Sequence, residues 1–271
     1  MQLRGLYISI FFLSFLNTTA QVLENSGAYS TSMAGLNVNN KDVWSINNNI
    51  GQLSNLKESG VSANLFQPFL LNDFNTASLV LGLKTGNGAF GLNYSNYGNE
   101  FLQIHNTGLG YSLQLGENLQ SGIKLNHFFY NAGEYYNSKS ILTADFGLAA
   151  QLTEELEIGL SIKNPTLSKL DDFDNERVPT VMQFAAGYQF SEMLSLHAGL
   201  KKDMVYPLSF LAAIDYQPTE KIKFKGGIGT NPTLAAFGIG VLLKNFEVNI
   251  ATQLHQILGW SPDFSITYNF N

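Results

Sequence analysis

The chain has 271 residues, a net charge of −6 at pH 7 and no cysteine. The acidic balance argues against a nucleic-acid partner, and the lack of cysteine excludes both a disulfide framework and a thiolate metal site. Charged residues make up 13% of the chain, well below the roughly 25% of an ordinary soluble domain, so an ordinary soluble surface is not expected.

The first twenty residues have the order of a secretory signal. Arg4 gives a positive start, residues 6–16 form an apolar core too short to span a bilayer, and Thr18, Thr19 and Ala20 are small residues before Gln21. We therefore predict a signal peptide over residues 1–20, cleaved after Ala20. The alternative is a buried N-terminal strand or helix.

Residues 21–56 are assigned to a separate N-terminal segment, lumenal or periplasmic, because regular alternation begins only near Ser59. From there, bulky apolar residues occupy every second position, as in residues 109–115 (LGYSLQL) and residues 156–163 (LEIGLSIK). A period of two is typical of strands with one apolar face. About fourteen such runs start near Ser59, Phe74, Ala89, Leu102, Leu119, Ser140, Leu156, Pro179, Leu194, Leu208, Ile222, Leu234, Phe246 and Phe264.

Beyond the signal, the sequence has no unbroken apolar run of eighteen residues, the length that a spanning helix needs. Only a closed barrel hides its backbone polar groups in lipid without helices. We therefore predict an all-β fold, a transmembrane antiparallel β-barrel of about fourteen strands over residues 57–271. The alternative is a secreted soluble sandwich or propeller, in which the bulky face would pack on another sheet.

The links between these strands alternate in length. Tight links are expected at residues 85–88, 116–118, 153–155, 191–193, 218–221 and 244–245, and these would be the short periplasmic turns. The longer links are expected at residues 67–73, 131–139, 164–178, 202–206 and 256–262, on the outside of the cell. An even number of strands places both termini on the periplasmic side of a bacterial outer membrane.

A resemblance extends over nearly the whole mature chain. Residues 32–53 (SMAGLNVNNKDVWSINNNIGQL) are similar to the first segment of FadL-type outer-membrane transporters and of the related PorV/PorQ-like barrels of Bacteroidota. The positions that carry a hatch-like motif are Gly35, Asp42, Trp44, Asn48 and Gly51. The resemblance to the PorV/PorQ-like group continues through residues 94–98, 163–165, 202–203 and 255–262. It implies a fourteen-stranded barrel and, for some members, a part in type IX secretion.

Few residues suggest chemistry. His105, His127, His197 and His255 lie on separate predicted strands, without a carboxylate or second histidine at ligand spacing. The sequence contains no Gly-x-Ser-x-Gly, P-loop or zinc-helix motif, so we expect no enzyme, no metal site and no cofactor. The acidic run at residues 171–176 could hold Ca²⁺, but a solvated loop is the favoured interpretation.

Charged residues on the polar face of the strands are expected to point into the lumen. Lys221, Lys223 and Lys225 alternate along one predicted strand. Candidate counter-charges on other strands are Asp145, Glu157, Asp215 and Glu247. A lumen filled or narrowed by paired charges is the favoured interpretation, with an anion-attracting strip as the alternative.

Two of the predicted outer loops are unusually apolar. Their bulky residues are Phe66, Phe69, Leu70 and Leu71 in the first, and Ile257, Leu258 and Trp260 in the last. Such residues at a rim either join the aromatic belt at the membrane surface or dock a partner or lipid-like ligand.

We therefore expect a non-enzymatic barrel in contact with outer-membrane lipid that acts in type IX secretion or surface-protein attachment, with secretion-system or surface proteins as partners. The alternative is a FadL-like channel for hydrophobic small molecules. The polar and small residues expected on the lumenal face argue against that alternative.

Overall fold

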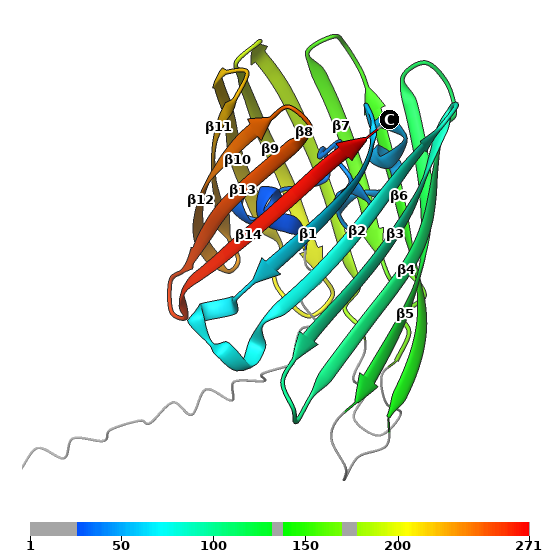
Figure 1. Ribbon diagram of the computed structural model, residues 1–271, viewed down its shortest axis with the longest axis vertical. Coiled ribbons are helices and arrows are strands. Elements are labelled where there is room, and N and C mark those ends of the chain that lie inside the picture. Colours follow the sequence, from blue (N-terminus) through cyan, green and yellow to red (C-terminus); the bar gives the residue numbers. More distant parts are fainter. Residues whose placement is uncertain (1–25, 132–137, 170–177, 271) are drawn as a thin grey trace, which may run out of the picture.

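The computed structural model describes residues 26–131, 138–169 and 178–270. Fourteen strands form one closed antiparallel barrel in which each strand pairs with the next in sequence (Figure 1). The first strand, β1 (Ser59–Phe66), closes the barrel by pairing with the last, β14 (Gly259–Phe270). The predicted fold class is confirmed, since a closed barrel leaves no free sheet edge.

The other twelve strands follow in chain order. They are β2 (Thr76–Thr85), β3 (Gly88–Gly98), β4 (Gln103–Gln114), β5 (Leu119–Asn131), β6 (Lys139–Gln151), β7 (Leu156–Lys163), β8 (Val181–Ser191), β9 (Leu194–Asp203), β10 (Ser209–Thr219), β11 (Ile222–Thr230), β12 (Thr233–Leu243) and β13 (Phe246–His255).

Thirteen of the fourteen predicted starts lie within two residues of the observed ones, and β14 is the exception. It begins at Gly259, five residues before the predicted Phe264, because residues 259–263 pair with β13. Trp260 therefore lies on a strand opposite Leu254, with its side chain on the outside of the barrel, and not in a loop.

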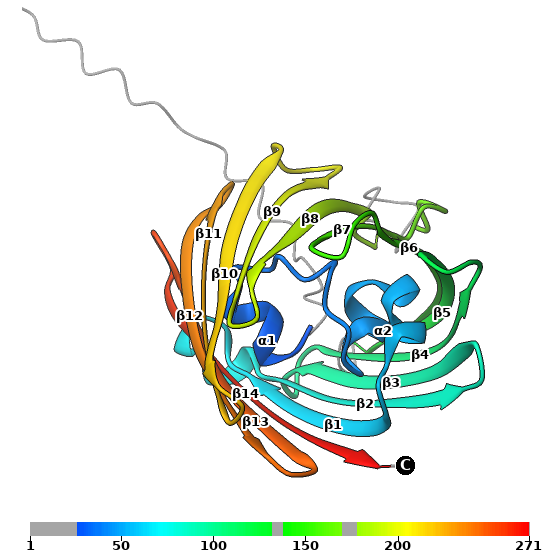
Figure 2. The same cartoon turned by 90° about the horizontal axis from the view of Figure 1, so that it is seen from above.

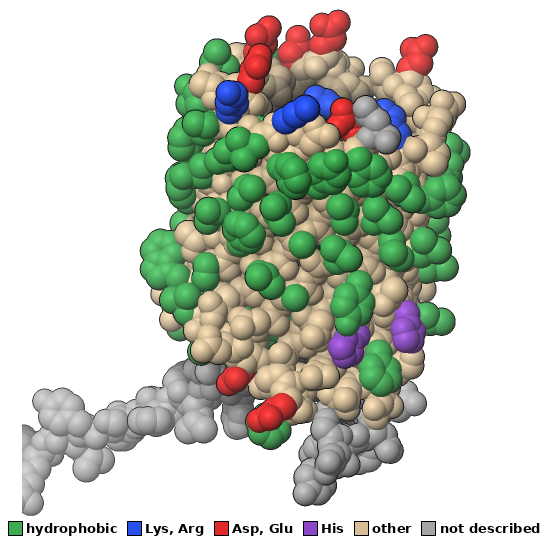
Figure 3. Space-filling model, viewed as in Figure 1, with side chains coloured by type: hydrophobic (Ala, Val, Ile, Leu, Met, Phe, Trp, Pro, Cys, Tyr) green, Lys and Arg blue, Asp and Glu red, His purple; other side chains and the backbone are tan. Residues whose placement is uncertain are grey.

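The bulky side chains of the strands point away from the lumen. Leu109 and Leu125 are direct neighbours on β4 and β5, and each is 61% exposed. Their chain neighbours Gly108 and Asn126 face inward and are buried. Figure 3 shows the resulting apolar band around the wall. A soluble sandwich would bury these faces, so the observed arrangement fits a wall surrounded by lipid.

The two ends of the barrel differ. At the turn end, the short turns between strands lie beside the start of β1 and the end of β14 (Figure 1). Charged side chains gather there on the face shown in Figure 3. At the loop end, the β1–β2 connection contains two short 3-10 helices, η2 (Pro68–Leu70) and η3 (Asn72–Phe74).

The N-terminal segment lies inside the barrel. Figure 2 shows its helices α1 (Gly27–Ser32) and α2 (Ser45–Asn48) within the ring of strands, and the 3-10 helix η1 (Ile50–Asn55) follows them. We call residues 26–56 the hatch. Within the described residues, no helix is both long and apolar enough to cross a membrane.

Candidate functional site

The candidate site is the lumen, which the hatch divides into two compartments. On one side of the hatch, α1 contacts β11–β14, and on the other η1 contacts β3–β6. The hatch buries its own apolar residues against small inward residues of the wall, with Val43, Trp44 and Ile46 against Val80 and Ala89. The hatch therefore contacts the wall on both sides of the lumen.

Glycines make room for the hatch on the inner wall. At ten positions on the strands, an added Cβ would lie within 3.1 Å of a hatch atom. These glycines are Gly60, Gly82, Gly91, Gly110, Gly122, Gly147, Gly159, Gly187, Gly227 and Gly238. Because a side chain at these positions would displace the hatch, the glycine belt sets how closely hatch and wall approach each other.

Side-chain hydrogen bonds fasten the hatch to several strands. The indole Nε1 of Trp44 donates to Ser62 Oγ on β1 at 2.9 Å. Asn49 Nδ2 donates to the carbonyl of Leu148 on β6 at 2.9 Å. Each bond satisfies a buried polar group, so the hatch is held in one place rather than packed loosely.

The residues of the hatch-like motif each have a structural task. The Gly35 carbonyl accepts a hydrogen bond from Gln183 Nε2 at 2.8 Å, and Asp42 Oδ1 accepts one from the Trp44 backbone N–H at 2.7 Å. Asn48 Nδ2 donates to the Ser26 carbonyl at 3.2 Å.

Gly51 lies against the backbone of Gly147, where a Cβ would come within 2.8 Å. The motif thus shapes the hatch and its seat on the wall.

At the loop end of β4–β6, the inner face of the wall carries an apolar cluster. We call this group the lumenal cluster, and its buried residues are Ile104, Phe128, Tyr130, Ile141 and Val178. The partly buried residues Tyr97 and Leu102 pack against it. The expectation of small and polar residues on the lumenal face is therefore wrong at this cluster, while the inward residues between it and the hatch, such as Asn106 and Asn126, are polar. The signal in the sequence is the run His127–Tyr130, where apolar residues stop alternating with small or polar ones.

At the loop end of the barrel, the two apolar loops that the sequence predicted separately lie side by side. The backbone N–H of Gln67 donates to the Pro262 carbonyl at 3.0 Å, and the Phe69 ring packs edge-on against His255 at 5.9 Å between centroids. They meet because β1 pairs with β14.

The exposed residues Leu70, Leu71, Ile257 and Leu258 form what we call the mouth patch. Phe66 instead turns inward and is buried. A groove of about 500 Å³ lies beside this patch, lined in part by Leu65, Ala77 and Phe264.

Most of the predicted lumen charges are paired, and several pair with the hatch. Lys223 Nζ lies 3.7 Å from Glu247 Oε1. Lys225 Nζ donates to Asn249 Oδ1 at 3.1 Å and sits 4.5 Å above the Tyr29 ring of the hatch.

Asp145 lies 3.9 Å from Lys124 Nζ, which also donates to the hatch side chain of Asn47 at 2.8 Å. Glu157 pairs with Lys41 of the hatch, and Asp215 faces Lys225 across the β10–β11 register.

One prediction about the charged residues needs correction. Lys221 lies exposed in the turn between β10 and β11, because β11 begins only at Ile222, so it does not face the lumen. His105 and His127 face outward near the loop end, where His105 Nδ1 is 2.9 Å from the Tyr94 hydroxyl and His127 contacts Ser140.

Among the described residues, no three histidines or carboxylates gather as metal ligands. The acidic run at residues 171–176 lies outside the described residues.

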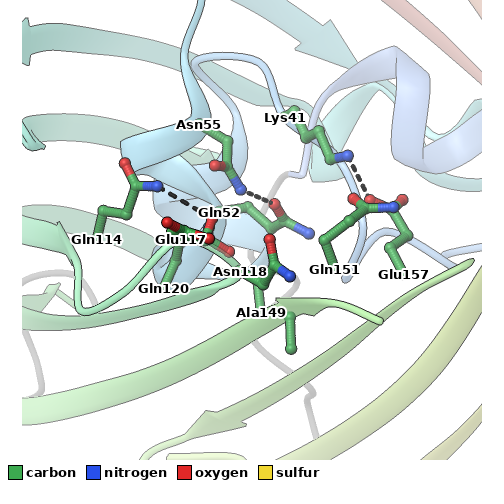
Figure 4. A pocket seen from close by; sticks show the side chains of 11 residues that line it. Lys41, Gln52, Asn55, Gln114, Glu117, Asn118, Gln120, Ala149, Gln151 and Glu157 are labelled. Carbon is green, nitrogen blue, oxygen red and sulfur yellow. Dashed lines mark hydrogen bonds and ion pairs between the residues drawn. The ribbon is translucent and has the colours of Figure 1, made fainter. Parts of the chain in front are cut away.

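On the turn side of the hatch there is a second compartment, a polar cavity of about 330 Å³ (Figure 4). Its lining comes from the hatch and from β4–β7 with their turns: Lys41, Gln52, Asn55, Gln114, Glu117, Asn118, Gln120, Ala149, Ala150, Gln151 and Glu157. Of these residues, the sequence singled out only Glu157.

A closed fourteen-stranded barrel plugged by its own N-terminal segment defines a class of outer-membrane proteins to which the fold can be compared. No model of a known protein family and no curated protein matches the chain.

Among solved structures, it is similar to the CymD monoaromatic hydrocarbon channel, with a TM-score of 0.72, 11% identity and coverage of 90% of this chain and 97% of that one. For the toluene transporter TbuX of Ralstonia pickettii, the TM-score is 0.72 and the identity 10%, over 90% and 98% of the two chains.

A FadL homologue of Pseudomonas aeruginosa matches with a TM-score of 0.63 and 12% identity, over 92% and 99% of the two chains. At these identities the likeness concerns the fold. The chain has the fold of FadL-type outer-membrane barrels.

Proposed function

We propose that the protein is a non-enzymatic outer-membrane channel for hydrophobic small molecules. The observation that carries this proposal is the lumenal cluster, a group of apolar side chains on the inner face of the wall at the loop end. The protein shares its fold with proteins described as a hydrocarbon channel and a toluene transporter, and this likeness supports the same function. The function proposed here is therefore the alternative that the sequence alone had disfavoured.

The arrangement of apolar groups gives a route for such a solute. The mouth patch offers exposed apolar surface at the β1–β2 and β13–β14 connections, and the lumenal cluster lies on the inner wall at the same end of the barrel, on β4–β6. Burying an apolar solute the size of a phenylalanine side chain contributes roughly 2 kcal/mol. The solute would then reach the hatch, which must yield before it can pass.

Uptake by cells tests the proposal. The protein is expressed in a bacterial host that lacks its own channel for hydrophobic solutes, and uptake of radiolabelled toluene and of a long-chain fatty acid is measured. We expect uptake above that of cells with an empty vector. Equal uptake of both solutes with and without the protein would remove the proposal.

Two neighbouring phenylalanines give a matched pair of variants. Phe128 belongs to the lumenal cluster, while Phe129 on the same strand faces outward. Phe128→Asn should lower uptake about tenfold, since it replaces an apolar contact of roughly 1.5–3 kcal/mol. Phe129→Asn should leave uptake unchanged, and an equal loss in both variants would point to a folding defect instead.

A second candidate function has an observation of its own. The mouth patch is large and exposed, with Ile257 84% accessible, and exposed apolar patches mark protein-docking sites. Together with the PorV/PorQ-like resemblance, it supports a part in type IX secretion or surface-protein attachment. Deletion of the gene should then alter the secreted and surface proteins, and an unchanged set would count against this function.

A further inference from the structure

The turn-side cavity is lined almost entirely by hydrogen-bonding groups. Six carboxamide side chains reach it, from Gln52 and Asn55 of the hatch and from the wall. The apolar part of the lining is small, namely Ala149 and Ala150, and the lining includes no aromatic ring. The cavity is thus suited to a polar molecule. It differs in this from the lumenal cluster on the other side of the hatch.

Some of these polar groups are already engaged in holding the rim. Gln114 Nε2 donates to the Glu117 carbonyl at 3.2 Å, and Gln151 Nε2 donates to the Thr153 carbonyl at 2.9 Å. The pair of Lys41 and Glu157 joins the hatch to β7 across the cavity, as Figure 4 shows. These contacts fix the shape of the cavity without needing a ligand.

Two other carboxamides are left with unused hydrogen-bonding capacity. Gln120 is only 5% exposed and lines the cavity, yet its side-chain amide has no partner among the described residues. Gln52 is almost fully buried, and its carbonyl accepts from Asn55 Nδ2 at 2.7 Å, while its own Nε2 donates to none of them. Neither amide is sealed off from the cavity, so both can hydrogen-bond to a molecule that enters it.

The lining also indicates the chemistry of that molecule. A carboxamide has the same donor and acceptor as a peptide group, so several of them around one space match a stretch of peptide backbone. Lys41 already pairs with Glu157, so Glu117 is the carboxylate of the lining that remains to attract a charged group, and it favours a cationic ligand. The absence of a ring in the lining disfavours a sugar held by stacking.

We propose that the turn-side cavity binds a short, polar, lysine-bearing peptide segment. The occupant would be an extended loop or tail of a partner protein that reaches the turn end of the barrel. This inference goes beyond the proposed channel and does not depend on it, because its residues lie on the other side of the hatch from the lumenal cluster.

A single cysteine can report on the occupancy of the cavity, because the natural chain has none. Asn118 lines the cavity, so Asn118→Cys places a thiol there. The purified full-length protein in detergent is treated with a small uncharged maleimide, and the rate of modification is measured with three probes. These are the blocked tripeptide Gly-Lys-Gly, its Gly-Glu-Gly counterpart, and maltose.

We expect the lysine peptide to slow the modification in a saturable way. The glutamate peptide should need about a tenfold higher concentration, in line with the loss of a charge-assisted contact. No protection at millimolar lysine peptide, equal protection by both peptides, or protection by maltose alone would overturn the proposal.

A matched pair of glutamines controls for folding. Gln120→Leu removes the unpaired amide and should weaken protection by the lysine peptide about tenfold. Gln189→Leu is the control, because Gln189 is also a strand glutamine near the turn end, donating to the Ser191 carbonyl at 2.6 Å, but lies outside the cavity.

If Gln120→Leu does not fold, Gln52→Met takes its place, because it also removes an unused donor. Unchanged protection in the folded variant would overturn the proposal.

Discussion

Single glycines determine how the hatch fits the wall. At Gly147 an added Cβ would lie 2.6 Å from the backbone nitrogen of Gly51, and backbone atoms cannot give way as a flexible side chain can. Gly226 on β11 faces outward, and a Cβ there would meet its nearest neighbour at 3.7 Å. The same substitution therefore has different consequences at the two positions.

Gly147→Ala should loosen the hatch by about 1–3 kcal/mol, the usual cost of forcing a methyl group into a packed interface. In planar bilayers we expect longer and more frequent openings of the variant than of the natural protein. Gly226→Ala serves as the control and should leave the current traces unchanged. Identical traces for all three proteins would show that the glycine belt does not hold the hatch closed.

Asp42 makes the hatch sensitive to pH. Burial raises the pKa of Asp42 from 3.8 to about 6, and the nearby Glu247 adds to the rise, while the Trp44 N–H and Lys223 act in the other direction. Because the pKa is raised in the folded hatch, the protonated form is the favoured one there. Its contribution to stability is complete below about pH 4 and is lost as the pH rises through about 6.

Hydrogen exchange of the hatch amides measures this dependence. After correction for the intrinsic rate, protection of the Trp44 amide should fall between pH 4.5 and pH 7.5, a window chosen around the folded pKa of about 6. In Asp42→Asn, which keeps an acceptor for that amide, protection should be nearly constant with pH. A parallel fall in both proteins would assign the effect to another group.

Along a strand, the effect of a substitution on the outward face depends on the depth of that position in the membrane. Leu125 lies in the middle of β5, and Leu115 lies just past the end of β4, and the two are similarly exposed, at 61% and 58%. The exposed fractions do not distinguish the two residues, but their depths in a surrounding bilayer do.

An arginine at these two positions should therefore have unequal effects. Leu125→Arg should destabilise the barrel by about 2–4 kcal/mol, as for a charge near the bilayer midplane, and Leu115→Arg by at most about 1 kcal/mol, as near the interface. Urea unfolding in lipid vesicles measures both. Equal losses would mean that the apolar band is not centred in the bilayer.

The strands could be predicted from the sequence because one physical rule, alternation between lipid and lumen, acts along each of them. The rule fails where both faces are apolar, as at Phe128 and Tyr130, so the lumenal cluster was not foreseen. It fails also at Trp260, which was placed in a loop although it lies in β14, opposite Leu254 of β13. Gln52 and Gln120 come together only through closure of the barrel around the hatch, and a local pattern does not show this.

For the whole molecule, the difference between the two ends implies an orientation. We expect the turn end, with both ends of the barrel chain, on the periplasmic side and the loop end outside the cell. Single cysteines at Lys244 in a turn and at Ile257 in the mouth patch distinguish the two ends.

On intact cells, a membrane-impermeant maleimide should label Ile257→Cys and not Lys244→Cys, while both should react after the cells are broken. The reverse pattern would invert the orientation of the barrel.

The seam between β1 and β14 also sets the order of assembly. Ser59 pairs with Phe270, so one edge of β1 has no partner until the final twelve residues of the chain are in place, although the other edge pairs with β2. Until then, the nascent chain carries two edges able to join the strands of other chains. The edge of β1 that faces β14 is therefore the position at which an unfinished barrel is most exposed to pairing with another chain.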